Sequence, residues 1–139
     1  MKVLLYEIGR TPDDRLSWKP CDTARSALEI LAECTLVTRN WAEILERGES
    51  LSAEAYFSVF SGIDALLSRE LIVDALTAET SHLVSVIRGI PDEKLSGELR
   101  LFWGESASLG SWLHWVAIHN SYHLGQISYI QRLYGDIED

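Results

Sequence analysis

The stretch WLHWVAIHNSYHLGQISYI, residues 112–130, sets out the pattern that decides the fold. One set of its residues recurs at steps of three and four, which places the members on one face of an α-helix. That face comprises Trp112, Val116, His119, His123, Ile127 and Ile130. Because it is apolar apart from the two histidines, we expect it to pack against other helices. The helix should begin at Ser106 or Ser108, whose hydroxyls can accept hydrogen bonds from free N–H groups, and end at Gly135.

The same spacing predicts two more long helices, in segments that contain no proline. The first should begin near Asp22 or Thr23, continue to about Arg47 and stop at Gly48, with an apolar face formed by Ile30, Val37, Trp41 and Ile44. The second should cover residues 63–89 and end at Gly89 and Pro91, with an apolar face formed by Leu76, Leu83, Val86 and Ile90.

The remaining segments are short. Residues 2–10 are expected to form a first, short helix, and residues 11–14 can start one further turn, with Pro12 at its first position. Residues 91–107 are expected to form a connecting segment between helices. We find no alternation of apolar and polar residues long enough to predict a β-strand. The sequence therefore predicts an all-α fold, an antiparallel helical bundle that forms a single domain over residues 1–139.

Composition and charge limit the cellular location and the classes of binding partner that we expect for this protein. A hydrophobic content of 47% with 24% charged residues is ordinary for a globular domain. The formal net charge of −9 repels phosphate backbones, so nucleic acid is not expected as a partner. The first ten residues lack the apolar core of a signal peptide, and no window approaches the roughly 18 apolar residues of a membrane span. We expect a cytoplasmic protein with no membrane partner, in which Cys21 and Cys34 remain thiols.

His119 and His123 are the first candidates for chemistry. Their spacing of four places both imidazoles about one turn apart on the same helix face, where one metal ion can bind both. Buried unpaired polar groups cost roughly 1–3 kcal/mol each, so a bound cation is one way to satisfy two buried rings. Hydrogen bonds to neutral partners, or one shared proton, are the alternatives. His82 and His114 lie off this face, and we expect them at the surface or beside it.

A third ligand must come from another helix. Glu33 lies in step with the apolar face of the segment that ends near Arg47, so its carboxylate can point inward. Glu79 is an alternative on the segment 63–89, and Cys34 could supply a thiol in place of Glu33. Two histidines and one carboxylate leave positions open for water or substrate, as catalytic sites do.

Several motifs together resemble one family. The run His119-Asn120-Ser121-Tyr122-His123-Leu124-Gly125-Gln126-Ile127, followed by Tyr129, Leu133, Tyr134, Gly135 and Asp136, is similar to the last helix of the DinB/YfiT-like superfamily. The other matching motifs, in the same order along the chain, are Trp18-Lys19-Pro20, Ser26 with Glu29-Ile30-Leu31, Ile90-Pro91-Asp92-Glu93 and Phe102-Trp103-Gly104.

The resemblance implies an up-down-down-up four-helix bundle, commonly a homodimer, with a divalent metal held by three histidines. Two of these correspond to His119 and His123, whereas the family's first histidine falls on Glu33. An oxygen ligand there would favour zinc, iron or manganese, with nickel also used in the family, or would mark a branch without metal. The first helix is shorter than the family's usual one, and apolar surface left exposed on that side would favour a dimer.

The resemblance also implies an activity. Relatives transfer a low-molecular-weight thiol to an electrophile, or use a thiol in isomerisation, and a divalent ion would activate the thiol. In this chain Glu33, His119 and His123 would hold the ion, and Gln126 would orient a ring or the substrate, a small molecule. The alternative is a metal-free dimeric bundle, stress-related or ligand-binding, whose histidines are structural.

Overall fold

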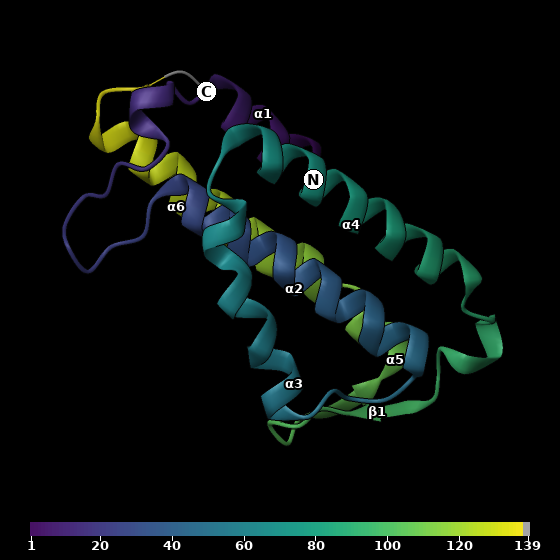
Figure 1. Ribbon diagram of the computed structural model, residues 1–139. Helices are drawn as coiled ribbons and strands as arrows, with labels where there is room; N and C mark the ends of the chain where they lie inside the picture. Colours follow the sequence, from purple (N-terminus) through teal and green to yellow (C-terminus); the bar gives the residue numbers. More distant parts are fainter. Residues whose placement is uncertain (138–139) are drawn as a thin grey trace.

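A computed structural model describes residues 1–137 (Figure 1). The α-helices are α1 (Lys2–Arg10), α2 (Ala27–Arg47), α3 (Ala53–Ser58), α4 (Arg69–Gly89), α5 (Leu109–Trp112) and α6 (Trp115–Leu133). Three 3₁₀ segments, η1 (Asp13–Arg15), η2 (Val59–Leu66) and η3 (Asp92–Lys94), lie between them, and β1 (Glu98–Arg100) pairs with β2 (Ser106–Ser108). The protein is therefore mainly helical, and none of the helices described is long and apolar enough to cross a membrane.

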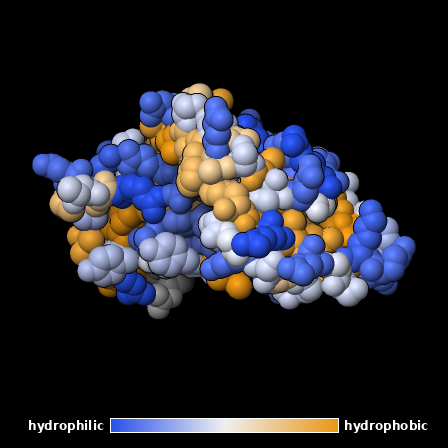
Figure 2. Space-filling model, turned by 90° about the horizontal axis from the view of Figure 1, so that it is seen from below, coloured by the Kyte–Doolittle hydropathy of each residue, from blue (hydrophilic) through white to orange (hydrophobic). Residues whose placement is uncertain are grey.

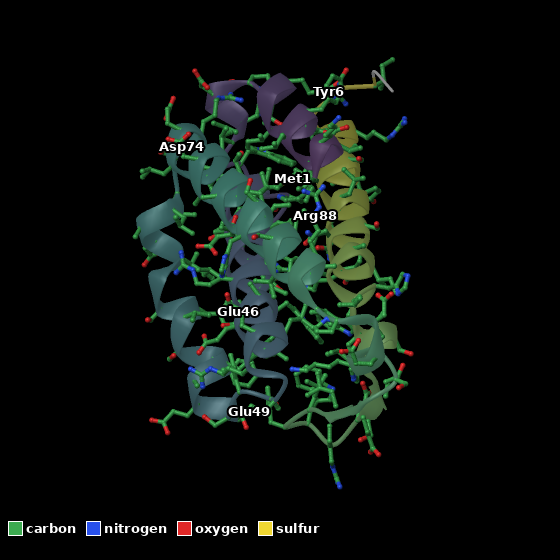
Figure 3. All side chains as sticks on the ribbon, turned by 90° about the vertical axis from the view of Figure 1, so that its right-hand side faces the viewer. Met1, Tyr6, Glu46, Glu49, Asp74 and Arg88 are labelled. Carbon is green, nitrogen blue, oxygen red and sulfur yellow. The ribbon has the colours of Figure 1, made fainter. Side chains whose placement is uncertain are left out.

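Helix α2 packs against both α4 and α6, and α1 contacts α4 and α6 at one end of the molecule (Figure 1). Figure 3 shows Met1 on the inner side of α1 and Glu49, just beyond α2, at the opposite end. Ion pairs define the directions: Arg39 and Glu46 of α2 pair in that order with Glu79 and His82 of α4, so α2 and α4 run the same way.

Helices α1 and α6 run in the opposite direction to that pair. Met1 and Leu4 lie beside residues 117–124, and Arg10 pairs with Asp136 just beyond α6, so α1 and α6 are parallel. Arg69, at the start of α4, donates hydrogen bonds to the Ile8 and Thr11 carbonyls, whereas Met1 contacts Thr80. These contacts make α1 antiparallel to α4, and they close one end of the molecule.

Helix α2 forms the centre of the core, because apolar residues cover most of its circumference. Its buried residues join one apolar cluster with α1, α4 and the end of α6, and a second with α4, β1, α5 and the start of α6. The residues predicted to face inward from this segment are all buried: Ile30, Val37, Trp41 and Ile44.

The predicted start of α2 at Asp22 or Thr23 is wrong, because the helix begins at Ala27. Ser26 is the N-cap: its hydroxyl accepts a hydrogen bond from the Glu29 N–H at 3.3 Å, and the Glu29 carboxylate accepts one from the Ser26 N–H at 2.8 Å. This reciprocal capping box satisfies two N–H groups at once, which a lone Asp or Thr cap does not. The predicted stop is confirmed, since Gly48 has a left-handed conformation with φ of 68°.

The helix predicted over residues 63–89 is shorter at its start. It begins at Arg69, where the Ser68 hydroxyl accepts the Leu71 N–H and caps the first turn. The preceding residues form the 3₁₀ segment η2, which packs against α2. The end at Gly89, followed by Pro91, is as predicted.

The connection predicted over residues 91–107 contains structure that the sequence analysis missed. β1 and β2 form an antiparallel hairpin in which Glu98, Leu99 and Arg100 pair with Ser108, Ala107 and Ser106. Gly104 makes the turn between them with φ of +99°, a conformation that side chains disfavour. Strands of three residues are too short to show the alternation that identifies a strand.

The last helix is interrupted. Ser108 caps α5 as one of the two predicted caps, but α5 stops at Trp112, and α6 starts at Trp115 after a turn at Leu113 and His114. Trp112 and Trp115, one on each side of the turn, both pack against Trp41 of α2 with ring centroids 5.8 and 5.2 Å away. Aromatic packing at this corner replaces the continuous helix that periodicity predicts.

Candidate metal centre

The candidate site lies between α2 and α6, where the inward faces of the two helices meet. His119 and His123 project from α6 one turn apart, and Glu33 and Cys34 project from α2. His123 and Cys34 are buried, while His119 and Glu33 are half-buried. The antiparallel packing of α2 and α6 thus brings together residues that are far apart in the sequence.

The ligand atoms of Glu33, His119 and His123 converge. The two histidine Nε2 atoms are 3.1 Å apart, and Glu33 Oε1 lies 3.7 Å from His119 Nε2 and 3.4 Å from His123 Nε2. Nitrogen and oxygen ligands about 2.1 Å from a tetrahedral zinc ion lie about 3.4 Å from one another. The three distances scatter around that value, so the donor set fits a small divalent cation.

Cys34 is a second candidate for the third ligand. The Cys34 Sγ and one nitrogen of each of His119 and His123 all lie within 4.8 Å of one another. Burial raises the pKa of the Cys34 thiol to about 12, so without a metal this sulfur carries its proton. The structure therefore brings both Glu33 and Cys34 to the histidines, and the alternative drawn from the sequence stays open.

Hydrogen bonds around the histidines orient their rings. His123 Nδ1 lies 2.7 Å from Gln126 Oε1, so the nitrogen donates its proton and leaves the Nε2 lone pair facing Glu33. Gln126 Nε2 in turn donates to the Tyr122 hydroxyl at 3.0 Å. The ring of Trp115 stacks on His119 with centroids 5.2 Å apart. These contacts hold the tautomer and the ring orientation that a metal ligand needs.

The surroundings keep both histidines neutral. Burial, reinforced by the neighbouring His123, lowers the pKa of His119 to about 4. Burial also lowers the pKa of His123, although the hydrogen bond that its Nδ1 donates to Gln126 opposes this shift. Neutral imidazole is the form that binds a metal ion, so at neutral pH neither ring has to lose a proton first.

Arg25 is a residue of this site that the sequence analysis missed. Its guanidinium forms an ion pair with Glu33 Oε2 and a hydrogen bond of 3.4 Å to Gln126 Oε1. It lies in the loop just before α2, where helical periodicity gives no information about the direction of a side chain. No signal in the sequence singled it out.

Comparison with known proteins identifies the family. The family model of the DinB superfamily matches residues 2–127. The chain belongs to the DinB superfamily. Among solved structures, it is similar to the DinB-like protein YjoA from Bacillus subtilis, with a TM-score of 0.71 and 18% identity over 99% of this chain and 88% of that one. At this identity the likeness concerns the fold. The comparison with curated proteins found no match.

The other residues considered from the sequence lie elsewhere in this DinB superfamily chain. Glu79 pairs with Arg39 through contacts of 2.8 and 2.7 Å, so its carboxylate is engaged across α2 and α4. The structure thus pairs Glu79 with Arg39, whereas it brings Glu33 and Cys34 to the two histidines. His82 and His114 are exposed, as expected, and His82 lies 3.5 Å from Glu46. Both cysteines are free thiols.

Proposed function

We propose that this DinB superfamily protein is a divalent-metal-dependent enzyme whose ion is held by Glu33, His119 and His123. The observation that supports this most is the convergence of Glu33 Oε1 and the two Nε2 atoms at 3.1–3.7 Å, the spacing of ligands around one small ion. Gln126 orients His123 from behind. Membership of a superfamily that is often associated with metals agrees with this assignment.

The reaction proposed is transfer of a low-molecular-weight thiol to an electrophilic small molecule. When bound, a divalent ion lowers the pKa of a coordinated thiol, so a nucleophile exists at neutral pH. The residues of the chain supply the setting for this step. Glu33 offsets one positive charge, the neutral histidines leave the net charge of the ion high, and the stacked ring of Trp115 shields His119 from water. Zinc, nickel, iron or manganese each suits a site of two nitrogens and one oxygen.

The proposal includes the architecture and the setting of the protein. We take α1, α2, α4 and α6 as the up-down-down-up four-helix bundle of the family, in one domain over residues 1–139 with a short first helix. We also propose that the protein works in the cytoplasm as a homodimer, on a small molecule rather than on nucleic acid or a membrane. The formal charge of −9 supports the exclusion of nucleic acid.

The test measures the amount of metal bound per protein chain, by plasma mass spectrometry, on protein purified without a histidine tag. Wild type should carry near-stoichiometric metal, and Glu33→Ala and His123→Ala should each remove it. His82→Ala, which changes an exposed histidine outside the site, is the matched control and should keep it. Cys34→Ala separates the two candidate ligands, because it should keep metal if Glu33 is the third ligand. A wild-type protein that contains no metal and does not bind added zinc, nickel, iron or manganese would contradict the proposal.

The alternative function is a metal-free, stress-related or ligand-binding bundle in which the histidines are structural. One observation favours it: Arg25 already pairs with Glu33, and the two histidine nitrogens can share one hydrogen bond at 3.1 Å. In that case His123→Ala would lower stability by the 0.5–3 kcal/mol that is usual for a core substitution and would change no bound metal. Chemical denaturation of the same variants therefore separates the two functions.

A further inference from the structure

A pocket of about 400 Å³ lies beside the candidate metal centre. Its walls come from the loop before α2, from α2 itself and from the second half of α6, and most of them are apolar, including Pro20, Ile30, Tyr129 and Leu133. Its volume lies in the range of small-molecule sites. Arg25 and Gln126 also line it.

These two polar residues connect the pocket to the metal centre. Arg25 forms the ion pair with Glu33, and Gln126 accepts the hydrogen bond of His123. The same two side chains therefore touch proposed metal ligands and line the pocket. A molecule bound there would lie directly against the residues that surround the ion.

The charge of the pocket indicates the chemistry of its ligand. Among the residues that the structure describes, 1–137, Arg25 is the charged residue that lines the pocket, and no acidic residue shares the lining. A guanidinium binds a carboxylate through paired hydrogen bonds, and the apolar walls suit a hydrocarbon body. We propose that this pocket binds a small amphiphilic carboxylate, the substrate of the proposed enzyme, with its headgroup on Arg25 and its body against Ile30, Tyr129 and Leu133.

Metal and carboxylate should bind cooperatively. Without metal, Arg25 is paired with Glu33, and a ligand must compete with that internal carboxylate. When Glu33 binds a cation through Oε1, the ion draws on the charge of the carboxylate, so Oε2 pairs less strongly with Arg25, and the guanidinium lies close to a second positive charge. A ligand carboxylate then restores the pairing, so each ligand raises the affinity for the other by the same factor. This step rests on the proposed function, because it needs Glu33 as a metal ligand.

The test measures binding of octanoate by calorimetry to zinc-loaded and to EDTA-treated protein, with octanol as the uncharged analogue. We expect octanoate to bind the zinc-loaded protein about tenfold more tightly than the metal-free protein, and about tenfold more tightly than octanol, the loss usual for one charge-assisted hydrogen bond. Arg25→Met should abolish the preference for octanoate, and Arg25→Lys should retain part of it. Arg39→Met is the matched control, because Arg39 is a similarly exposed arginine paired with Glu79, and it should change neither value.

A separate zinc titration of the same variants distinguishes the two proposals. Arg25→Met should bind zinc at least as tightly as wild type, since it frees Glu33 and removes a nearby positive charge. Zinc binding without any preference for octanoate over octanol, or a preference that survives in Arg25→Met, would overturn the carboxylate pocket and leave the metal site standing. Octanoate binding that depends on Arg25 in a protein that takes up no zinc would support the pocket and contradict the metalloenzyme.

Discussion

At the residue scale, the two cysteines are predicted to differ in their reactivity toward a thiol reagent. Cys21 is exposed, and a hydrogen bond with Thr23 lowers the pKa of its thiol, whereas burial raises the pKa of Cys34 to about 12. Because the thiolate is the reactive form, Cys21 should react quickly with Ellman's reagent at pH 8, and Cys34 should not react in the folded protein. Counting modified thiols in metal-free native and denatured protein checks this expectation.

The control for this prediction is Cys21→Ser, which should leave no rapidly reacting thiol in the native protein and one in denaturant. Two rapidly reacting thiols in native wild type would mean that the reagent reaches Cys34 between α2 and α6. The buried position assigned to Cys34 beside the histidines would then be wrong.

Helical periodicity predicts that Glu33 and the two histidines point inward, and Arg25 shows where that reasoning stops. His119, His123 and Glu33 share the period of the apolar residues around them, so the direction of their side chains could be predicted before any packing was known. Arg25 lies in a loop, where each residue has its own backbone angles. Its pairing with Glu33 depends on where the loop returns to α2, which only the tertiary structure provides.

At the element scale, the start of α2 gives a prediction with a defined pH dependence. Glu29 lies in the capping box and receives a hydrogen bond of 2.6 Å from Lys19. Burial raises the pKa of Glu29, but the hydrogen bonds from Lys19 and Ser26 outweigh it and lower the pKa below its usual value. A lowered carboxyl pKa in the folded state contributes stability above the unfolded pKa, and that contribution disappears as the pH falls through the folded value.

Glu29→Gln keeps the capping side chain and removes its charge. At pH 7 the variant should be less stable than wild type by about 0.2–1 kcal/mol, the range of ion pairs near the surface, and the difference should become smaller at pH 3, as the pH falls toward the lowered pKa of Glu29. Urea denaturation at both pH values measures it. Glu49→Gln, at the exposed position beyond α2 that Figure 3 labels, should show no such dependence. A difference as large at pH 3 as at pH 7 would show that the charge of Glu29 has no part in it.

The elements that were not predicted share one physical cause. The 3₁₀ segment η2 packs against α2, the hairpin of β1 and β2 contacts α5, and the tryptophans on either side of the turn at Leu113 and His114 pack against Trp41 of α2. In the hairpin, for example, the Leu99 carbonyl accepts a hydrogen bond from Trp112 Nε1 at 2.9 Å. Periodicity identifies long helices because many residues repeat one signal, and segments of three to eight residues do not supply enough repeats.

At the scale of the whole molecule, the surface is a mixture of charged and apolar regions. Figure 2 shows, on one face, orange apolar patches separated by blue hydrophilic atoms. One set of exposed apolar residues has a regular arrangement, because its members follow one outward stripe of α6 at steps of four, seven and four: Ile118, Tyr122, Tyr129 and Leu133. An apolar stripe of this kind on a helix suits contact with another helix.

We expect the part of this stripe at Ile118 and Tyr122, away from the pocket that Tyr129 and Leu133 line, to pack against its counterpart in a second copy, which gives the homodimer proposed above. Light scattering after gel filtration should give twice the chain mass of 15.7 kDa. Ile118→Glu, which places a charge within this two-fold contact, should give monomers with an unchanged helical signal. Phe57→Glu, at an equally exposed apolar residue of α3, is the control and should remain dimeric. A monomeric wild type would contradict the dimer, and a dimeric Ile118→Glu variant would show that the interface lies away from α6.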